Sequence, residues 1–306
     1  MVDISGFKRR EILAMILAGT VTRLEVLRAD EKNFRLNYIL ASALYGTMDL
    51  ESILPEVHKT GADSIDIWCL KHGNQREQVD AMGVDAFAAQ LKKHGVKLGA
   101  FTRYPLGPFG LQDEMKVVQK LGGKLVVTGS GGPKDLEGDA LKAAVRVFVE
   151  KMKPHASAAE ELGVTIAIEN HGGSLLSSPD SLRYFAEFNT SRHLGVAFAP
   201  HHLHKAVDQM PKLIDDLGRN LVFFYAQEYG AGFSEKLTKE KELTQLPGFG
   251  GGLDYRPLLA ALRKNGYQGF VEIFMHPTPR GIPILPSVAE ITAAVNTSRT
   301  YLDSCR

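Results

Sequence analysis

The chain has 306 residues, of which 44% are hydrophobic and 23% are charged, and its formal net charge at pH 7 is +1. This length and composition suit one large α/β barrel or two small domains. We find no basic stripe and no apolar run of about 18 residues, so no nucleic-acid partner and no membrane partner is expected. The two cysteines, Cys69 and Cys305, predict neither a disulfide framework nor a thiolate metal site.

The N-terminal segment resembles a twin-arginine export leader. Arg9 and Arg10 precede a short apolar stretch, Ile12–Thr22, and such a basic pair before an apolar run is the export pattern. Charged residues just after the stretch are unusual for a leader. The alternative is therefore an amphipathic segment that stays on a cytoplasmic protein. We expect residues 1–29 to be an export leader to the periplasm and residues 30–306 to form the folded domain.

Eight apolar runs along the chain predict eight strands, and most of them follow a helical pattern that ends in glycine. Glycine just past a helix adopts a left-handed backbone without steric cost. Alternation of strand and helix in about 270 residues favours a single-domain (β/α)8 TIM barrel over an open doubly wound sheet. The predicted strands are Arg35–Ser42, Ser64–Trp68, Lys97–Thr102, Lys124–Gly129, Val164–Glu169, Leu194–Pro200, Leu221–Ala226 and Phe270–Phe274.

The connections support the same architecture. Helices are predicted at Leu141–Leu162 and Pro179–Phe188, the second with Ser178 as N-cap and proline at its first position. No GxGxxG follows the first strand, which argues against a Rossmann fold. The long irregular stretch Tyr229–Leu253 is a candidate rim or lid. The glycine-rich Gly129–Pro133 is predicted to leave the mouth clear, or alternatively to cradle a hydroxyl or phosphate through its amides.

Val164–His171, which reads VTIAIENH, says more about function than any other segment. An apolar strand ends there in Glu169, Asn170 and His171. In a TIM barrel this end of a strand faces the mouth, where substrates bind. The alternative is a buried glutamate that only accepts hydrogen bonds from helix amides. We expect Glu169 to be functional.

Further polar side chains follow the other predicted strands. Three histidines, among them His202, lie in FAPHHLHK after the sixth strand, although one or two of them could simply bond to backbone. Glu272 alternates with Phe270 and Phe274, so it faces inward if they do, and a carboxylate inside a barrel needs a cation or a proton. Side chains that would suit a polyhydroxylated ligand are Asn37, Trp68, Lys71, Arg103, Gln227 and His276.

These residues resemble the xylose-isomerase-like TIM barrels, also called sugar phosphate isomerases/epimerases, over about residues 35–304. The likeness depends on the motifs IAIENH, LGVAFAPHHL and GYQGFVEI. The resemblance implies one divalent metal held by four ligands, of which only Glu169 is clearly retained. Ala199, Tyr225 and Phe274 stand where the family has Asp, His and Glu. Either a metal (Mn, Mg or Zn) has moved to Glu169, His202 and Glu272, or the chemistry runs without it.

The resemblance implies a sugar isomerase or epimerase that moves protons beside a sugar carbonyl. Glu169 and Glu272 would be acid/base or metal-holding groups, and His171 and His202 polarising or ligand groups. The expected partner is a small-molecule carbohydrate. One alternative is a lyase or hydrolase of keto-sugar glycosides, which needs the same groups. Another is a carbohydrate-binding barrel without catalysis, which the loss of the family's metal ligands would favour.

Overall fold

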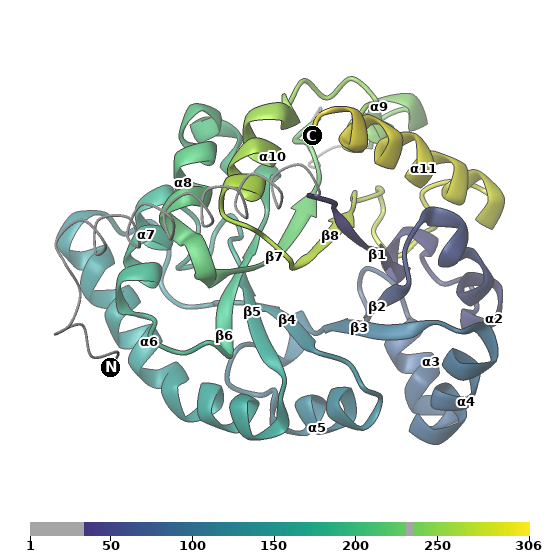
Figure 1. Ribbon diagram of the computed structural model, residues 1–306, viewed down its shortest axis with the longest axis horizontal. Coiled ribbons are helices and arrows are strands. Elements are labelled where there is room, and N and C mark those ends of the chain that lie inside the picture. Colours follow the sequence, from purple (N-terminus) through teal and green to yellow (C-terminus); the bar gives the residue numbers. More distant parts are fainter. Residues whose placement is uncertain (1–33, 231–235) are drawn as a thin grey trace, which may run out of the picture.

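The computed structural model describes residues 34–230 and 236–306. Within them eight parallel strands close into a barrel in sequence order, with helices around the outside (Figure 1). The predicted TIM barrel is therefore confirmed, while the predicted leader, residues 1–29, lies outside the described residues. The strands are β1 Asn37–Ala41, β2 Ser64–Trp68, β3 Lys97–Thr102, β4 Leu125–Gly129, β5 Thr165–Glu169, β6 Leu194–Phe198, β7 Leu221–Ala226 and β8 Phe270–Ile273.

Strand limits agree with the prediction to within two residues at each end. The sixth strand stops at Phe198 because Pro200 cannot donate a ladder hydrogen bond and instead opens a 3₁₀ segment. The short 3₁₀ segments are η1 Ser42–Tyr45, η2 Leu54–Glu56, η3 His58–Thr60, η4 Tyr104–Leu106, η5 Pro200–Gln209 and η6 Gly218–Asn220.

The α-helices run back along the outside of the barrel and bury their apolar faces against the sheet. The predicted helix Pro179–Phe188 is found with those limits, and Ser178 and Ser181 form a reciprocal capping box at its start. The helices are α2 Leu50–Ile53, α3 Gln75–Met82, α4 Val84–His94, α5 Gln112–Lys120, α6 Gly138–Leu162, α7 Pro179–Phe188, α8 Met210–Leu217, α9 Lys239–Leu243, α10 Tyr255–Lys264 and α11 Val288–Ser304. None of the helices described is long and apolar enough to cross a membrane.

Strand register determines which residues share a layer of the barrel. Glu272 in β8 lies beside Ile39 of β1 on one side and Tyr225 of β7 on the other. Asn37, the first residue of β1, pairs with Phe270, the first residue of β8. Asn37 is therefore at the N-terminal end of the barrel, and Glu272 is inside the sheet rather than at its edge.

Candidate active site and metal centre

A cavity of about 490 Å³ opens at the C-terminal ends of the strands. This volume lies in the range of small-molecule sites. One wall is aromatic, built from Trp68, Tyr104 and Phe274. The other lining side chains include the polar groups Glu169, His171, His276, Lys71, His72 and Arg280. The mouth therefore combines a flat apolar surface with groups that can transfer protons or bind anions.

Glu169 is the carboxylate of this cavity. It ends β5 and is only 4% exposed. The Tyr104 hydroxyl donates a short hydrogen bond to Glu169 Oε2. Burial raises the pKa of Glu169, and nearby His171 and the Tyr104 hydrogen bond offset part of the rise. A buried carboxylate with a raised pKa in a cavity is a candidate for proton transfer.

Asn170 explains how the chain brings the ends of β5 and β6 together. Its side-chain Oδ1 accepts from the Ala199 amide at 2.7 Å, and its Nδ2 donates to the Ala199 carbonyl at 3.0 Å. The His202 amide in turn donates to the same carbonyl at 3.2 Å. Asn170 is fully buried, and its two hydrogen bonds to Ala199 hold the segment that carries His202 beside Glu169.

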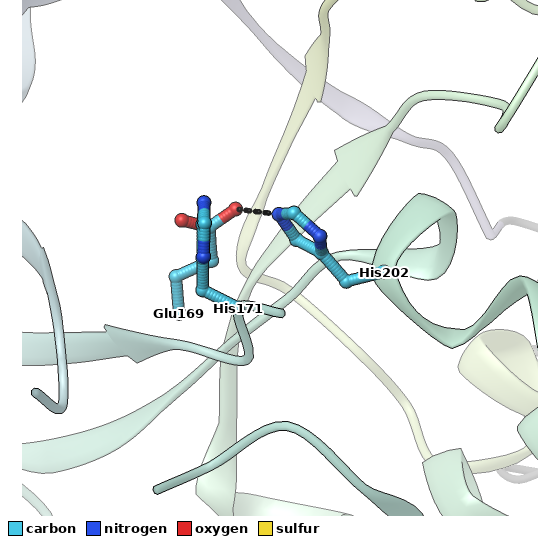
Figure 2. A group of neighbouring side chains, drawn as sticks. All are labelled: Glu169, His171 and His202. Atoms are coloured by element: carbon cyan, nitrogen blue, oxygen red, sulfur yellow. Dashed lines mark ion pairs between the residues drawn. The ribbon is translucent and has the colours of Figure 1, made fainter. Parts of the chain in front are cut away.

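Glu169, His171 and His202 form a group whose ligand atoms all lie within 4.8 Å of one another. Figure 2 shows the three side chains converging, with His202 Nε2 at 3.7 Å from Glu169 Oε1. His171 Nδ1 must donate to the Gly172 carbonyl at 2.7 Å, which leaves its Nε2 lone pair for a ligand. One carboxylate and two imidazoles are the donors of many catalytic zinc sites.

The protonation state of His202 is the one that metal binding requires. Burial is the largest cause that lowers the pKa of His202 to about 2, and the nearby charge of Arg280 adds to it. Its ring is therefore neutral at pH 7, as metal binding requires. His202 Nε2 makes no hydrogen bond to any described residue, although it is buried. An unsatisfied nitrogen facing a carboxylate is the observation that a bound divalent ion would explain. The residues present fit such an ion.

The predicted ligand Glu272 is not part of this group. It is fully buried inside the barrel, and the group it faces is the carboxyl of Asp66 from β2. The set predicted from the sequence was Glu169, His202 and Glu272, whereas the candidate group that the structure brings together has His171 as its third member. Of the residues that the resemblance places at the family's other metal positions, Ala199 and Phe274 have no ligand atom and Tyr225 is buried, and Phe274 stacks on Trp68 with ring centroids 4.6 Å apart.

Asp66 and Glu272 form a buried acid pair beneath the cavity. Thr102 Oγ1 donates to Asp66 Oδ2 at 2.6 Å, while Asp66 Oδ1 and both Glu272 oxygens have no hydrogen bond of good geometry among the described residues. They face each other and the Trp68 indole nitrogen. Burial raises the pKa of Asp66 to about 6, and burial plus the charge of Asp66 raises the pKa of Glu272 well above its usual value. The pair therefore holds a proton more readily than two exposed carboxyl groups would.

The predicted substrate-binding residues divide into two groups. Trp68, Lys71 and His276 line the cavity. Arg103 instead forms an ion pair with Glu114 of α5 at 3.2 Å, because that buried acid faces it across the β3–α5 connection. The other two are also away from the ligand space. Gln227 is buried and donates to Gln245 at 3.1 Å, and Asn37 is at the opposite end of the barrel.

Three important residues were missing from the predicted site, namely Tyr104, Arg280 and Asp66. Tyr104 and Arg280 each follow a strand, so their place near the mouth was readable, but their contacts with Glu169 and His72 were not. Asp66 sits in the middle of the apolar run SIDIW. The alternation argument that turned Glu272 inward applies equally to Asp66 and would have found it.

Comparison with known proteins agrees with the barrel fold. The model of the xylose isomerase-like TIM barrel family matches residues 54–294. The chain belongs to this family. A search of curated proteins by sequence found no match.

Solved structures similar to this xylose isomerase-like barrel include several sugar epimerases. The IolI protein "with a binding zinc atom" is 18% identical, with 88% of this chain and 98% of that chain covered and a TM-score of 0.66. A D-tagatose 3-epimerase-like protein is 16% identical, with 88% and 98% covered and a TM-score of 0.64. The 3-keto-D-glucoside 4-epimerase YcjR from E. coli is 14% identical, with 87% and 100% covered and a TM-score of 0.61. At these identities the likeness shows the shared fold.

Proposed function

We propose that this chain is a sugar isomerase or epimerase that moves a proton beside a sugar carbonyl in the mouth cavity. The observation that carries the proposal is Glu169, a buried carboxylate that lines the cavity and bonds to Tyr104. Family membership and the epimerase neighbours support the reaction class. The aromatic wall beside Glu169 suits the apolar face of a sugar ring.

In this proposal Glu169 is the proton acceptor. Its Oε2 is held by the Tyr104 hydroxyl, and its Oε1 faces His202 Nε2 at 3.7 Å. Because burial raises its pKa, the acid formed after proton transfer is less disfavoured than that of an exposed glutamate. The imidazoles of His171 and His202 lie beside it as hydrogen-bonding partners for sugar oxygens. Burial in the cavity limits the access of water to the reacting atoms.

Glu169, His171 and His202 are the residues that would hold a divalent metal, and their donor set favours zinc over magnesium. Such an ion would polarise a sugar carbonyl and so make the neighbouring C–H bond more acidic. The same groups also serve the elimination reactions of a keto-sugar lyase. The replacement of the family's other metal positions by Ala199, Tyr225 and Phe274 favours, as the remaining candidate, a barrel that only binds carbohydrate.

The test is proton exchange measured by NMR in D₂O. A panel of ketoses and 3-keto-glycosides is incubated with wild type, Glu169→Gln and a control, Glu160→Gln, which changes an exposed glutamate of α6. Each protein is used metal-free and zinc-reloaded. We expect loss of the C–H signal beside the carbonyl, followed by the isomer, with wild type and Glu160→Gln only.

The three candidate functions, isomerase or epimerase, lyase or hydrolase, and binding barrel, give different results in this experiment. Release of the aglycone in place of an isomer identifies a lyase or hydrolase. Binding without any exchange, equal in wild type and Glu169→Gln, contradicts the catalytic proposal and leaves a binding barrel.

A further inference from the structure

Two cations, Lys71 and Arg280, stand at the rim of the cavity, and Glu169 deeper in the cavity is the one lining carboxylate that attracts Arg280. Lys71 follows β2 and Arg280 follows β8, and both line the cavity. Neither forms an ion pair with an acidic side chain in the described part of the chain, whereas Arg76 and Arg103 both pair with Glu114. The single carboxylate among the lining residues is Glu169. The charged lining therefore carries two positive groups against one negative group.

His72 orients the Arg280 guanidinium. Arg280 Nη1 lies 3.1 Å from His72 Nε2. Burial, with the nearby charge of Arg280, lowers the pKa of His72 to about 3, so the ring is neutral and its nitrogen accepts the hydrogen bond. A neutral acceptor directs the guanidinium without cancelling its charge. This contrasts with the Arg103–Glu114 pair, where a carboxylate does cancel it.

Glycines allow the loops near these cations to pack closely, backbone against backbone. Gly281 has φ +84°, and a Cβ added there would lie 2.8 Å from the Lys71 carbonyl oxygen. Gly46, in the loop after β1, has φ +57°, and its added Cβ would lie 2.4 Å from the Ile282 carbonyl carbon. Only glycine permits this backbone and this approach. The backbone of Lys71 is therefore held next to the residue that follows Arg280, so both cations start from one rigid part of the rim.

We infer that the substrate of the proposed site carries a carboxylate or phosphate group, which Arg280 and Lys71 bind at the rim while the sugar ring reaches Glu169. This inference names the substrate class of the proposed function and depends on it for the reaction, but not for the binding. A guanidinium presents paired N–H donors that match two oxygens of one anion, and a lysine adds a point charge. A neutral sugar would offer neither cation an anionic partner in the cavity.

The test is a titration with three probes that share the ring but differ in charge: D-glucose, D-glucuronate and D-glucose 6-phosphate. Trp68 is the one tryptophan of the chain and lies next to His72, with ring centroids 5.1 Å apart, so its fluorescence reports binding. Calorimetry gives a second measurement. In wild type we expect at least one anionic sugar to bind about tenfold or more tightly than glucose, since a hydrogen bond to a charged group is strong. High salt should reduce the preference.

Variants test whether the preference for an anionic sugar over glucose comes from the cations at the rim. Arg280→Gln should remove about 10- to 100-fold of the affinity for the anionic sugar and leave glucose unchanged. Arg280→Lys should restore part of it. Arg192→Gln, which changes an exposed arginine before β6, is the matched control and should behave like wild type. The two anionic probes separate a carboxylate substrate from a phosphate substrate.

Several outcomes overturn the inference. They are equal binding of all three sugars to wild type, no binding of either anionic sugar at the highest soluble concentration, and an anion preference that survives in Arg280→Gln. Failure of the proposed reaction looks different. In that case no keto-sugar exchanges its proton, yet wild type and Glu169→Gln still prefer the anionic probe and Arg280→Gln still loses the preference.

Discussion

Replacing Asp66 by asparagine should stabilise the protein at neutral pH and leave it nearly unchanged at pH 4. Asp66 is fully buried, and its pKa rises from 3.8 to about 6 because burial disfavours the charged form. When the pKa of an acid is higher in the folded state than in the unfolded state, the free energy of unfolding is greatest below the unfolded pKa. It falls as pH rises towards and through the folded pKa. Two pKa units at about 1.4 kcal/mol each amount to about 3 kcal/mol lost by pH 8.

Asparagine is the suitable replacement because it removes the charge and keeps the shape. Its amide oxygen still accepts from Thr102, which donates to Asp66 Oδ2 at 2.6 Å in wild type. Its amide nitrogen can donate to Glu272, the carboxyl that faces it. We therefore expect the stability difference to grow from near zero at pH 4 to about 3 kcal/mol at pH 8 in favour of the variant.

The assay is urea unfolding followed by Trp68 fluorescence between pH 4 and pH 8. With a slope of about 3 kcal/mol per molar urea, the midpoint of the variant should lie about 1 M higher at pH 8. Asp216→Asn is the control of opposite sign. Hydrogen bonds and charges of Lys212 and Arg183 lower the pKa of Asp216, so that variant should be less stable than wild type throughout this pH range and should approach it only at lower pH, as wild-type Asp216 becomes protonated in the folded state. An Asp66→Asn midpoint shift that does not change with pH would refute this account of the acid pair.

Three further predictions concern the site and the N-terminus. Glu169→Gln should abolish turnover with no loss of thermal stability, since glutamine still accepts from Tyr104 and removes a buried charge; a large drop in melting temperature with normal activity per folded molecule would mean that the role is structural. Zinc retained after dialysis should fall sharply in His202→Ala and stay unchanged in Glu272→Gln, as measured by elemental analysis; equal metal in His202→Ala and wild type would reject the set. We also propose that residues 1–29 are removed on export, which predicts a mature N-terminus near Asp30 by mass spectrometry, and an intact Met1 in a purely cytoplasmic pool would contradict it.

The amino-acid sequence by itself determined the barrel and the position of its principal acid. The spacing of apolar residues in strands and helices, and the glycines that end helices, are local signals. They arise from the geometry of a few consecutive residues. The helix Pro179–Phe188 shows this clearly, since its cap and first residue are readable from Ser178 and Pro179 alone. The place of Glu169 at the mouth follows from the same local reading, as it ends an apolar strand.

Only the tertiary structure decided which side chains meet. Glu272 was predicted to face inward and does, but strand β2 supplies Asp66 as its neighbour, so it forms an acid pair and is not part of the candidate metal group. Arg103 and Arg280 both follow strands, yet Arg103 forms an ion pair with Glu114 of α5, whereas Arg280 bonds to the neutral His72 and forms no ion pair with an acid among the described residues. Contacts between residues far apart in the chain depend on register and loop packing around the closed barrel. No short stretch of sequence contains that information.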